Sequence, residues 1–190
     1  MKKVLVIDNY DSFTYNLVHL VHEVTGERPQ VWRNDVFKLD AVAQFEYILL
    51  SPGPGLPSEA GLLEEVVKVY ASVKKILGVC LGHQAIGEVF GAQLKNLSRV
   101  YHGKETPVKV IRPDHPLFEN VQSPFAAGRY HSWVVNRETV PADLEVIAED
   151  ESGEIMALSH RTYKVWGVQF HPESVMTPAG KQIIHNWIYL

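Results

Sequence analysis

The sequence contains a single cysteine, Cys80, among its 190 residues. One cysteine excludes a disulfide within the chain, so ordinary core packing has to hold the fold together. A lone cysteine in a domain of this kind is most often a small buried hydrophobic residue. A catalytic role for Cys80 therefore has to be argued from its neighbours in the sequence.

Clustered positive charge is also scarce. The formal net charge is −4, both signs are scattered along the chain, and no run of basic residues is longer than two. This pattern favours neither nucleic acid nor an anionic membrane as a partner.

Long hydrophobic runs are missing near the amino terminus. Met-Lys-Lys is followed by only four apolar residues, VLVI, before Asp8. Such a run is too short for the core of a signal peptide or for a membrane span. We therefore expect a cytoplasmic protein without a membrane partner.

The chain does contain a regular alternation of strand-like and helix-like segments. Its length suits one domain over residues 1–190, and it holds no repeat, low-complexity segment or linker. In the first half, uninterrupted apolar strands alternate with helical periodicity, which is typical of a parallel sheet covered on both faces. The strands are expected at 3–8, 29–35, within 47–55 and at 74–80, and the helices at 13–24, before Gly26, and at about 58–73.

Residues 105–170 have a different pattern. Strand-like pieces follow one another there with only turns between them, and the tail from Pro178 has the pattern of a closing helix. The predicted fold class is α/β: a three-layer, open, mostly parallel sheet with helices on both faces and an antiparallel extension. The strand-like pieces of the extension are 106–111, 144–149, 154–160 and 163–170.

The neighbours of Cys80 have the pattern of a nucleophile elbow. Gly78-Val79-Cys80-Leu81-Gly82 has the form G-x-C-x-G, the thiol counterpart of G-x-S-x-G, in which a strand turns sharply into a helix. Such a turn exposes the sulfur at the carboxyl end of a parallel strand, near a helix N-terminus that favours a thiolate. A buried cysteine in a glycine-rich turn is the alternative interpretation of this motif alone.

A reactive thiol also needs a base with an orienting carboxylate. Among nine histidines, His171 stands out because WGVQFHPES ends an apolar run and places Glu173 two residues further on. In an extended segment these two side chains point to the same side, so Glu173 can hold the imidazole in the useful tautomer. An isolated His-Pro-Glu at a strand end also fits a surface turn.

The segment LLSPGPGLP, residues 49–57, follows another buried strand. Gly53 lies between two prolines, so its N–H is the only main-chain donor of those three residues, and without a Cβ it can approach a ligand closely. Together with the N–H of Leu81, it suits an oxyanion hole. An ordinary Pro/Gly turn is the alternative.

Three motifs, SPGPG, GVCLGHQ and FHPES, in this order and at these separations, resemble the class I, or triad-type, glutamine amidotransferases. VLVIDNYDSFTYNL, HGK at 102–104 and RYHS at 129–132 narrow the resemblance to the small glutaminase subunits that serve chorismate-using synthases. The match spans essentially the whole chain. Three separated motifs of this length outweigh the ordinary interpretation of each one.

The resemblance implies a role for each matching residue. Cys80 is expected to be the nucleophile, His171 the general base and acid, and Glu173 the carboxylate that orients His171. Trp133 departs from the pattern, because relatives often have an aliphatic residue after YHS. The oxyanion hole is assigned to the N–H groups of Gly53 and Leu81, and glutamine binding to Gly53, Pro54, Gly55, Gln84, Ser132 and Trp133.

The implied reaction is hydrolysis of L-glutamine to glutamate and ammonia, with ammonia passing to a chorismate-binding synthase subunit in a hetero-oligomer. Overall resemblance, including glycine at position 55, favours anthranilate synthase of tryptophan biosynthesis as the partner enzyme. Aminodeoxychorismate synthase of the folate pathway is the alternative. A cysteine hydrolase of peptides or γ-glutamyl conjugates and a binding subunit without chemistry are the competing classes.

No cofactor and no metal are expected. His19 and His22 are three residues apart on the first predicted helix but have no further ligands, and His83 and His131 lack a ligand-like spacing.

Overall fold

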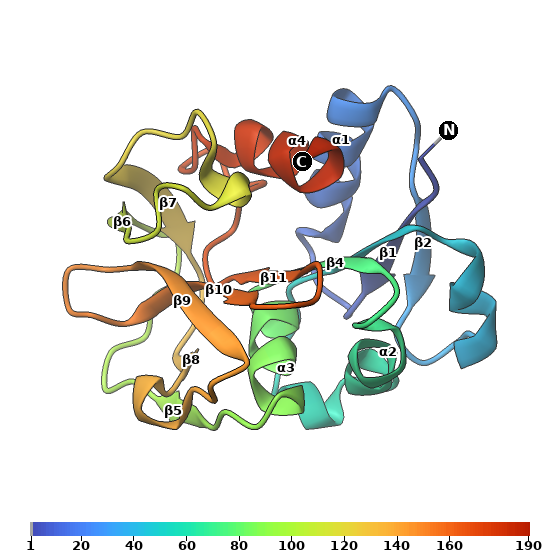
Figure 1. Ribbon diagram of the computed structural model, residues 1–190, viewed down its shortest axis with the longest axis horizontal. Helices are drawn as coiled ribbons and strands as arrows, with labels where there is room; N and C mark the ends of the chain where they lie inside the picture. The colour runs from blue at the N-terminus through green and yellow to red at the C-terminus, as the bar shows by residue number, and fades with distance from the viewer. Residues whose placement is uncertain (1) are drawn as a thin grey trace.

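A computed structural model describes residues 2–190 and places helices on both faces of a mixed sheet (Figure 1). Within these residues, nine strands pair in the order β2-β1-β3-β4-β11-β10-β9-β6-β7, and β5 pairs with β8 separately. The strands are β1 (Val4–Asp8), β2 (Gln30–Arg33), β3 (Tyr47–Leu50), β4 (Lys75–Val79), β5 (Leu94–Asn96), β6 (Lys104–Val110), β7 (Phe125–Arg129), β8 (Trp133–Val135), β9 (Leu144–Glu149), β10 (Ile155–His160) and β11 (Val165–Val168). The α-helices are α1 (Thr14–Thr25), α2 (Leu63–Tyr70), α3 (Leu81–Val89) and α4 (Gly180–Tyr189).

The parallel half of the sheet consists of β2, β1, β3, β4 and β11. Its central strands read as short apolar runs because both faces of the sheet are covered. α1 and α4 pack on one face and α2 and α3 on the other, with the sheet between the two pairs (Figure 1). The predicted three-layer α/β arrangement is confirmed.

The first helix ends where the sequence predicts. Gly26 follows α1 with a φ of 76°, a left-handed conformation that glycine adopts without strain. Its N–H donates to the carbonyl of His22 at 2.8 Å, which closes the last turn. Within residues 2–190, no helix is both long and apolar enough to cross a membrane.

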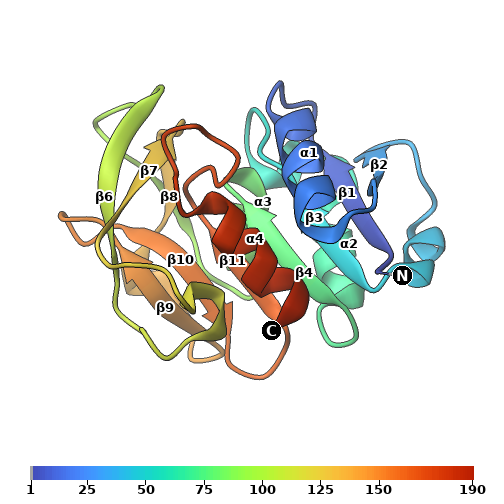
Figure 2. The same cartoon turned by 90° about the horizontal axis from the view of Figure 1, so that it is seen from above.

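The antiparallel extension begins at β11, which pairs with β10, and continues through β9, β6 and β7 (Figure 2). This arrangement agrees with the prediction for residues 105–170. The strand β7 was not predicted, because Phe-Ala-Ala-Gly-Arg contains no β-branched residue and has little strand propensity. The strands β5 and β8, which have three residues each, were not predicted either.

The helix expected at 58–73 is shorter than predicted. A 3-10 turn at Pro57–Glu59 precedes it, and α2 begins only at Leu63. Gly61, between the two, has a φ of 57°, and a Cβ there would lie 2.7 Å from the carbonyl oxygen of Asn34. This contact with a distant loop interrupts the helix. Periodicity within the segment cannot reveal it.

The start of α4 packs directly on the chain that follows β11. α4 begins at Gly180, shortly after Pro178, as the tail pattern predicts. A Cβ on Gly180 would lie 1.7 Å from the carbonyl oxygen of Pro172, the residue between His171 and Glu173. Only glycine fits this approach of one backbone to another.

We expect Gly180→Ala to lower the free energy of unfolding by about 1–3 kcal/mol, the usual cost of overpacking, because the new methyl group meets backbone rather than a movable side chain. Urea denaturation followed by circular dichroism measures the change. Lys181→Ala, at the exposed next position, is the control and should stay within about 0.5 kcal/mol of the parent protein. Equal stability of Gly180→Ala and the parent would contradict the contact.

Candidate active site

Cys80 stands at the junction between β4 and α3. Its φ of 53° and ψ of −99° form a conformation that is rare for a residue with a side chain. Its N–H donates to the carbonyl of Val168 at 2.8 Å, and its own carbonyl accepts from the N–H of Gln84 at 3.0 Å. Main-chain hydrogen bonds on both sides therefore hold a sharp strand-to-helix turn of the elbow type.

Two glycines make this turn possible. A Cβ on Gly78 would lie 2.4 Å from the carbonyl carbon of Gly82, and a Cβ on Gly82 would lie 2.6 Å from Cβ of Leu50. The strand, the turn and the helix thus touch backbone to backbone. Larger residues at either position would push α3 away from the sheet.

His171 and Glu173 form a buried pair. Nδ1 of His171 and Oε1 of Glu173 are 2.6 Å apart, and the two side chains are 2% and 0% exposed. The main chain of His171 is anchored to β7, since its N–H donates to the carbonyl of Gly128 at 3.0 Å. The rings of Phe13 and Tyr130 pack on the imidazole. Its Nε2 has no hydrogen-bond partner of regular geometry within residues 2–190.

The pKa of His171 is raised to about 10. Burial lowers this pKa, but interactions with the nearby Cys80 sulfur and with the Glu173 carboxylate raise it by more. At neutral pH the imidazole is therefore cationic. This positive charge suits a neighbouring thiolate.

A cavity of about 380 Å³ opens beside Cys80. This volume suits a small-molecule ligand. His171 and Glu173 are buried and are not part of its lining, but Tyr130, which is, packs on the imidazole of His171. Its lining contains Cys80 and every residue predicted to hold glutamine, namely Gly53, Pro54, Gly55, Gln84, Ser132 and Trp133, together with Leu56, Tyr130 and His131.

The two residues predicted for the oxyanion hole lie in contact. A Cβ on Gly53 would be 2.8 Å from Cδ2 of Leu81 and 2.6 Å from Cβ of Asn9. Asn9 is fixed in turn, because its Nδ2 donates to the carbonyl of Ser51 at 2.8 Å and its Oδ1 accepts from Nδ2 of Asn34 at 3.0 Å. Within residues 2–190, neither the N–H of Gly53 nor that of Leu81 takes part in the main-chain hydrogen bonds of turns and loops.

One polar residue beside the sulfur, Gln169, was not predicted from the sequence. Its Nε2 donates to Sγ of Cys80 at 3.5 Å, and its Oε1 accepts from Nε2 of Gln84 at 3.2 Å. Nε2 of Gln84 also donates to the carbonyl of Trp133 at 2.9 Å. A signal was present: Gln169 is the polar residue of an apolar run and lies two positions before His171, so alternation places both on one side.

The buried guanidinium group of Arg129 helps to fix the segment that contains Ser132 and Trp133. Nη1 of Arg129 pairs with Oδ2 of Asp150 at 2.7 Å, and both side chains are buried. Nε of Arg129 donates to Nε2 of His131, whose Nδ1 then donates to the carbonyl of Trp133 at 3.0 Å. Burial, followed by the charge of Arg129, lowers the pKa of His131 to about 3. His131 is therefore a neutral, structural histidine.

Within the part of the chain that the structure describes, no group of three His, Cys, Asp or Glu residues is arranged to hold a metal ion. His19 pairs with Glu23 on the exposed face of α1 at 3.0 Å. His83 is buried between α3 and the sheet, and burial lowers its pKa to about 4.

The sequence is similar to known proteins over nearly its whole length. The family model for Glutamine amidotransferase class-I matches residues 5–190. The chain is 47% identical over 189 residues to anthranilate synthase component 2 of Thermus thermophilus, covering 98% of this chain and 91% of the relative. It is 44% identical over 187 residues to aminodeoxychorismate/anthranilate synthase component 2 of Bacillus subtilis, covering 97% and 95%.

Two further proteins place the match in context. The chain is 44% identical over 191 residues to the bifunctional protein TrpGD of Thermotoga maritima and spans 32% of it. The fold matches that of a Thermoplasma acidophilum protein described as a candidate component of GMP synthase, with a TM-score of 0.88 over 99% of this chain and 92% of that one. At 24% identity, this second likeness concerns the fold alone. By its family match and its component 2 relatives, the chain belongs to the class I glutamine amidotransferases and is of the anthranilate synthase component 2 type.

Proposed function

We propose that the chain is the glutaminase subunit of a chorismate-using synthase, most closely anthranilate synthase, and that it acts through Cys80, His171 and Glu173. One observation carries this proposal. The elbow with Cys80, the loop with Gly53 and the loop with Ser132 converge on one cavity, and the imidazole of the His171–Glu173 pair lies near Cys80 and packs on Tyr130, which lines the same cavity. The family of the chain supports L-glutamine as the substrate.

In the first half-reaction, the Cys80 thiolate attacks the side-chain amide carbon of glutamine. The resulting oxyanion accepts hydrogen bonds from the N–H groups of Gly53 and Leu81. The cationic His171 then gives its proton to the leaving nitrogen, the C–N bond breaks, and ammonia departs. A glutamyl thioester on Cys80 remains.

In the second half-reaction, water attacks the thioester carbon and His171 removes a proton from that water. The C–S bond breaks, glutamate is released, and Cys80 returns to the thiolate. Glu173 is a positioning residue: its bond to Nδ1 keeps Nε2 of His171 directed at the reacting atoms.

Gln84 supplies an acceptor for the substrate. Both hydrogens of its Nε2 are engaged, one with the carbonyl of Trp133 and one with Gln169. Within residues 2–190 its Oε1 accepts no side-chain hydrogen bond, and we assign to it the role of accepting from the α-ammonium group of glutamine. Because the carbonyl of Trp133 is already bound twice, by Gln84 and His131, this departure from the family pattern acts through its ring at the rim of the cavity.

Gln169 is a second positioning residue in this proposal. It donates to the sulfur with one end of its amide and accepts from Gln84 with the other, while its side chain is fully buried. The amide therefore connects the residue that meets the substrate with the nucleophile. It favours the thiolate by a hydrogen bond to a charged acceptor.

Two synthases remain candidates for the partner. Relatives from several organisms carry the name anthranilate synthase component 2, which favours that enzyme. The Bacillus subtilis relative carries the names of both enzymes, which keeps aminodeoxychorismate synthase as the second candidate. In either case, the ammonia acceptor lies on a component 1 chain.

Cys80→Ser should abolish glutamine-dependent product formation by the reconstituted complex and leave ammonium-dependent formation intact, because only the nucleophile is lost. Assays with each candidate synthase subunit measure both rates. Since Cys80 is the only cysteine, diazo-oxonorleucine should add once to the parent protein, as read by mass. Full glutamine-dependent activity of Cys80→Ser would end this assignment.

Gln169→Glu keeps the shape of the side chain and replaces the donor to Cys80 with an acceptor. Hydrogen bonds to charged groups contribute about 1.5–3 kcal/mol, so kcat should fall about 10- to 100-fold while KM for glutamine changes little. Alkylation of Cys80 by iodoacetamide should slow in parallel, which a purely structural role would not cause. Gln122→Glu, at an exposed position, is the matched control. Unchanged alkylation and kcat would remove Gln169 from the mechanism.

The isolated chain should be a slow glutaminase that accelerates when its synthase partner is bound and loaded with chorismate. Hydrolysis without an acceptor wastes ammonia, and coupling between two sites typically amounts to about 5- to 150-fold. Glutamate release measured for the chain alone, with partner, and with partner plus chorismate tests this expectation. If the isolated chain already works at the rate of the full complex, an independent hydrolase becomes the better interpretation.

A further inference from the structure

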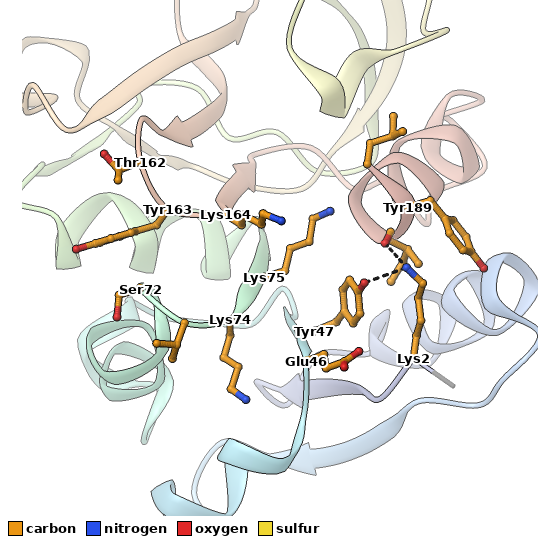
Figure 3. A pocket seen from close by; sticks show the side chains of 13 residues that line it. Lys2, Glu46, Tyr47, Ser72, Lys74, Lys75, Thr162, Tyr163, Lys164 and Tyr189 are labelled. Carbon is orange, nitrogen blue, oxygen red and sulfur yellow. Dashed lines mark hydrogen bonds between the residues drawn. The ribbon is translucent and has the colours of Figure 1, made fainter.

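A second cavity, of about 630 Å³, lies at the opposite end of the parallel strands from Cys80. It is formed where β3 and β4 begin, by the turn before β11 and by the end of α4 (Figure 3). Lys75 opens β4 and Cys80 follows the end of that strand, so the two ends are about 16 Å apart at ~3.3 Å per residue. This cavity, the lysine cavity, is therefore separate from the proposed glutamine pocket.

Three ammonium groups converge on the lysine cavity. Lys2, Lys75 and Lys164 supply them, and Figure 3 shows Lys75 and Lys164 directed toward the same space. Lys74 also lines the cavity, but its side chain points away from these two and its Nζ donates to the carbonyl of Ala43. Within residues 2–190, none of the three forms an ion pair with a carboxylate, although Glu46 is also part of the lining. The net charge of the chain is −4, so this group of positive charges is a local exception. The charges repel one another, and a bound anion would reduce that repulsion.

Two of these groups, those of Lys2 and Lys75, have protein contacts. Nζ of Lys2 donates to the hydroxyl of Tyr47 at 2.9 Å and to the carbonyl of Ile188 at 2.8 Å. Nζ of Lys75 lies 5.0 Å from the centre of the Trp166 ring. Burial, then the positive charges of Lys164 and Lys2, lower the pKa of Lys75 to about 8. A bound anion would remove this repulsion and favour the charged form.

We propose that the lysine cavity binds a small polyanion, a molecule with two or more phosphate or carboxylate groups close together. Ammonium groups act as point charges toward such ligands. Three of them close together should bind one polyanion more tightly than they bind single-charged anions. The volume lies in the range of small-molecule sites. Ser72, Thr162 and Tyr163 are also part of the lining. This inference does not depend on the proposed glutaminase activity.

Isothermal titration of the full chain with inorganic pyrophosphate, and separately with tricarballylate, tests the proposal. One equivalent of at least one of these anions should bind. Lys75→Met and Lys164→Met should each weaken binding at least tenfold, whereas Lys68→Met, which removes an exposed lysine paired with Glu64, should change it less than twofold. Far-ultraviolet circular dichroism and glutaminase activity verify that each variant is folded.

The pH dependence gives an independent readout. Tricarballylate stays ionised between pH 7 and 9, while Lys75, with a pKa of about 8, gains its charge as the pH falls across this range. The affinity of the chain for tricarballylate should therefore rise up to about tenfold from pH 9 to pH 7, and Lys75→Met should lose this dependence.

Absence of saturable binding of both anions, or equal weakening by Lys68→Met, would overturn the proposal. Binding of an aspartate-rich peptide without either small anion would overturn it in favour of a protein-docking surface.

Discussion

The parallel pairing of β4 with β11 is the constraint on which the candidate active site depends. Gly78 pairs with Gly167 and Val79 with Val168, so the residues that follow the two strands, Cys80 and Gln169, emerge side by side. These two residues are 89 positions apart in the chain. What brings them together is the burial of two apolar strands between helices on both faces, not any local signal at either motif.

Close backbone contacts convert this pairing into a fixed geometry. Gly78 and Gly82 let the turn at Cys80 press against the sheet, and Gly180 lets α4 press against Pro172. The positive φ of Cys80 is a strain of about 1–3 kcal/mol that persists only because the surrounding core determines it. The nucleophile candidate and the imidazole–carboxylate pair are thus held by two independent packing contacts, one made with α3 and the other with α4 on the opposite face of the sheet.

The charged side chains at the two ends of the central strands differ in their ion pairing. At the carboxyl ends, the buried charges are paired: His171 with Glu173 and Arg129 with Asp150. Buried pairs of this kind contribute geometry more than stability, because desolvation offsets much of their attraction. At the amino ends, Lys2, Lys75 and Lys164 form no ion pair within residues 2–190, although Glu46 also lines the lysine cavity. One sheet therefore has the candidate active site at one end and the lysine cavity at the other.

Local pattern was sufficient for much of the fold and for the motifs. Apolar runs and helical periodicity predicted the parallel half, and closely spaced strands predicted the antiparallel extension. The motifs around Cys80, Gly53 and His171, by their residues, order and separations, resembled the family to which the chain belongs. The break before α2 escaped prediction because it depends on the contact between Gly61 and Asn34, and β7 escaped because small residues carry little strand propensity.

The sequence by itself determined which residue types stand at each strand end: a thiol between glycines, a histidine two residues before a glutamate, and a glycine between prolines. Only the tertiary structure decided that Gln169 bridges the sulfur and Gln84, and that the ammonium groups of Lys2, Lys75 and Lys164 gather at one cavity. The roles proposed for the site residues stay predictions until measured. The physical reason for this division is that residue type and spacing act within a few positions, whereas distances between remote segments are set by strand pairing and core packing.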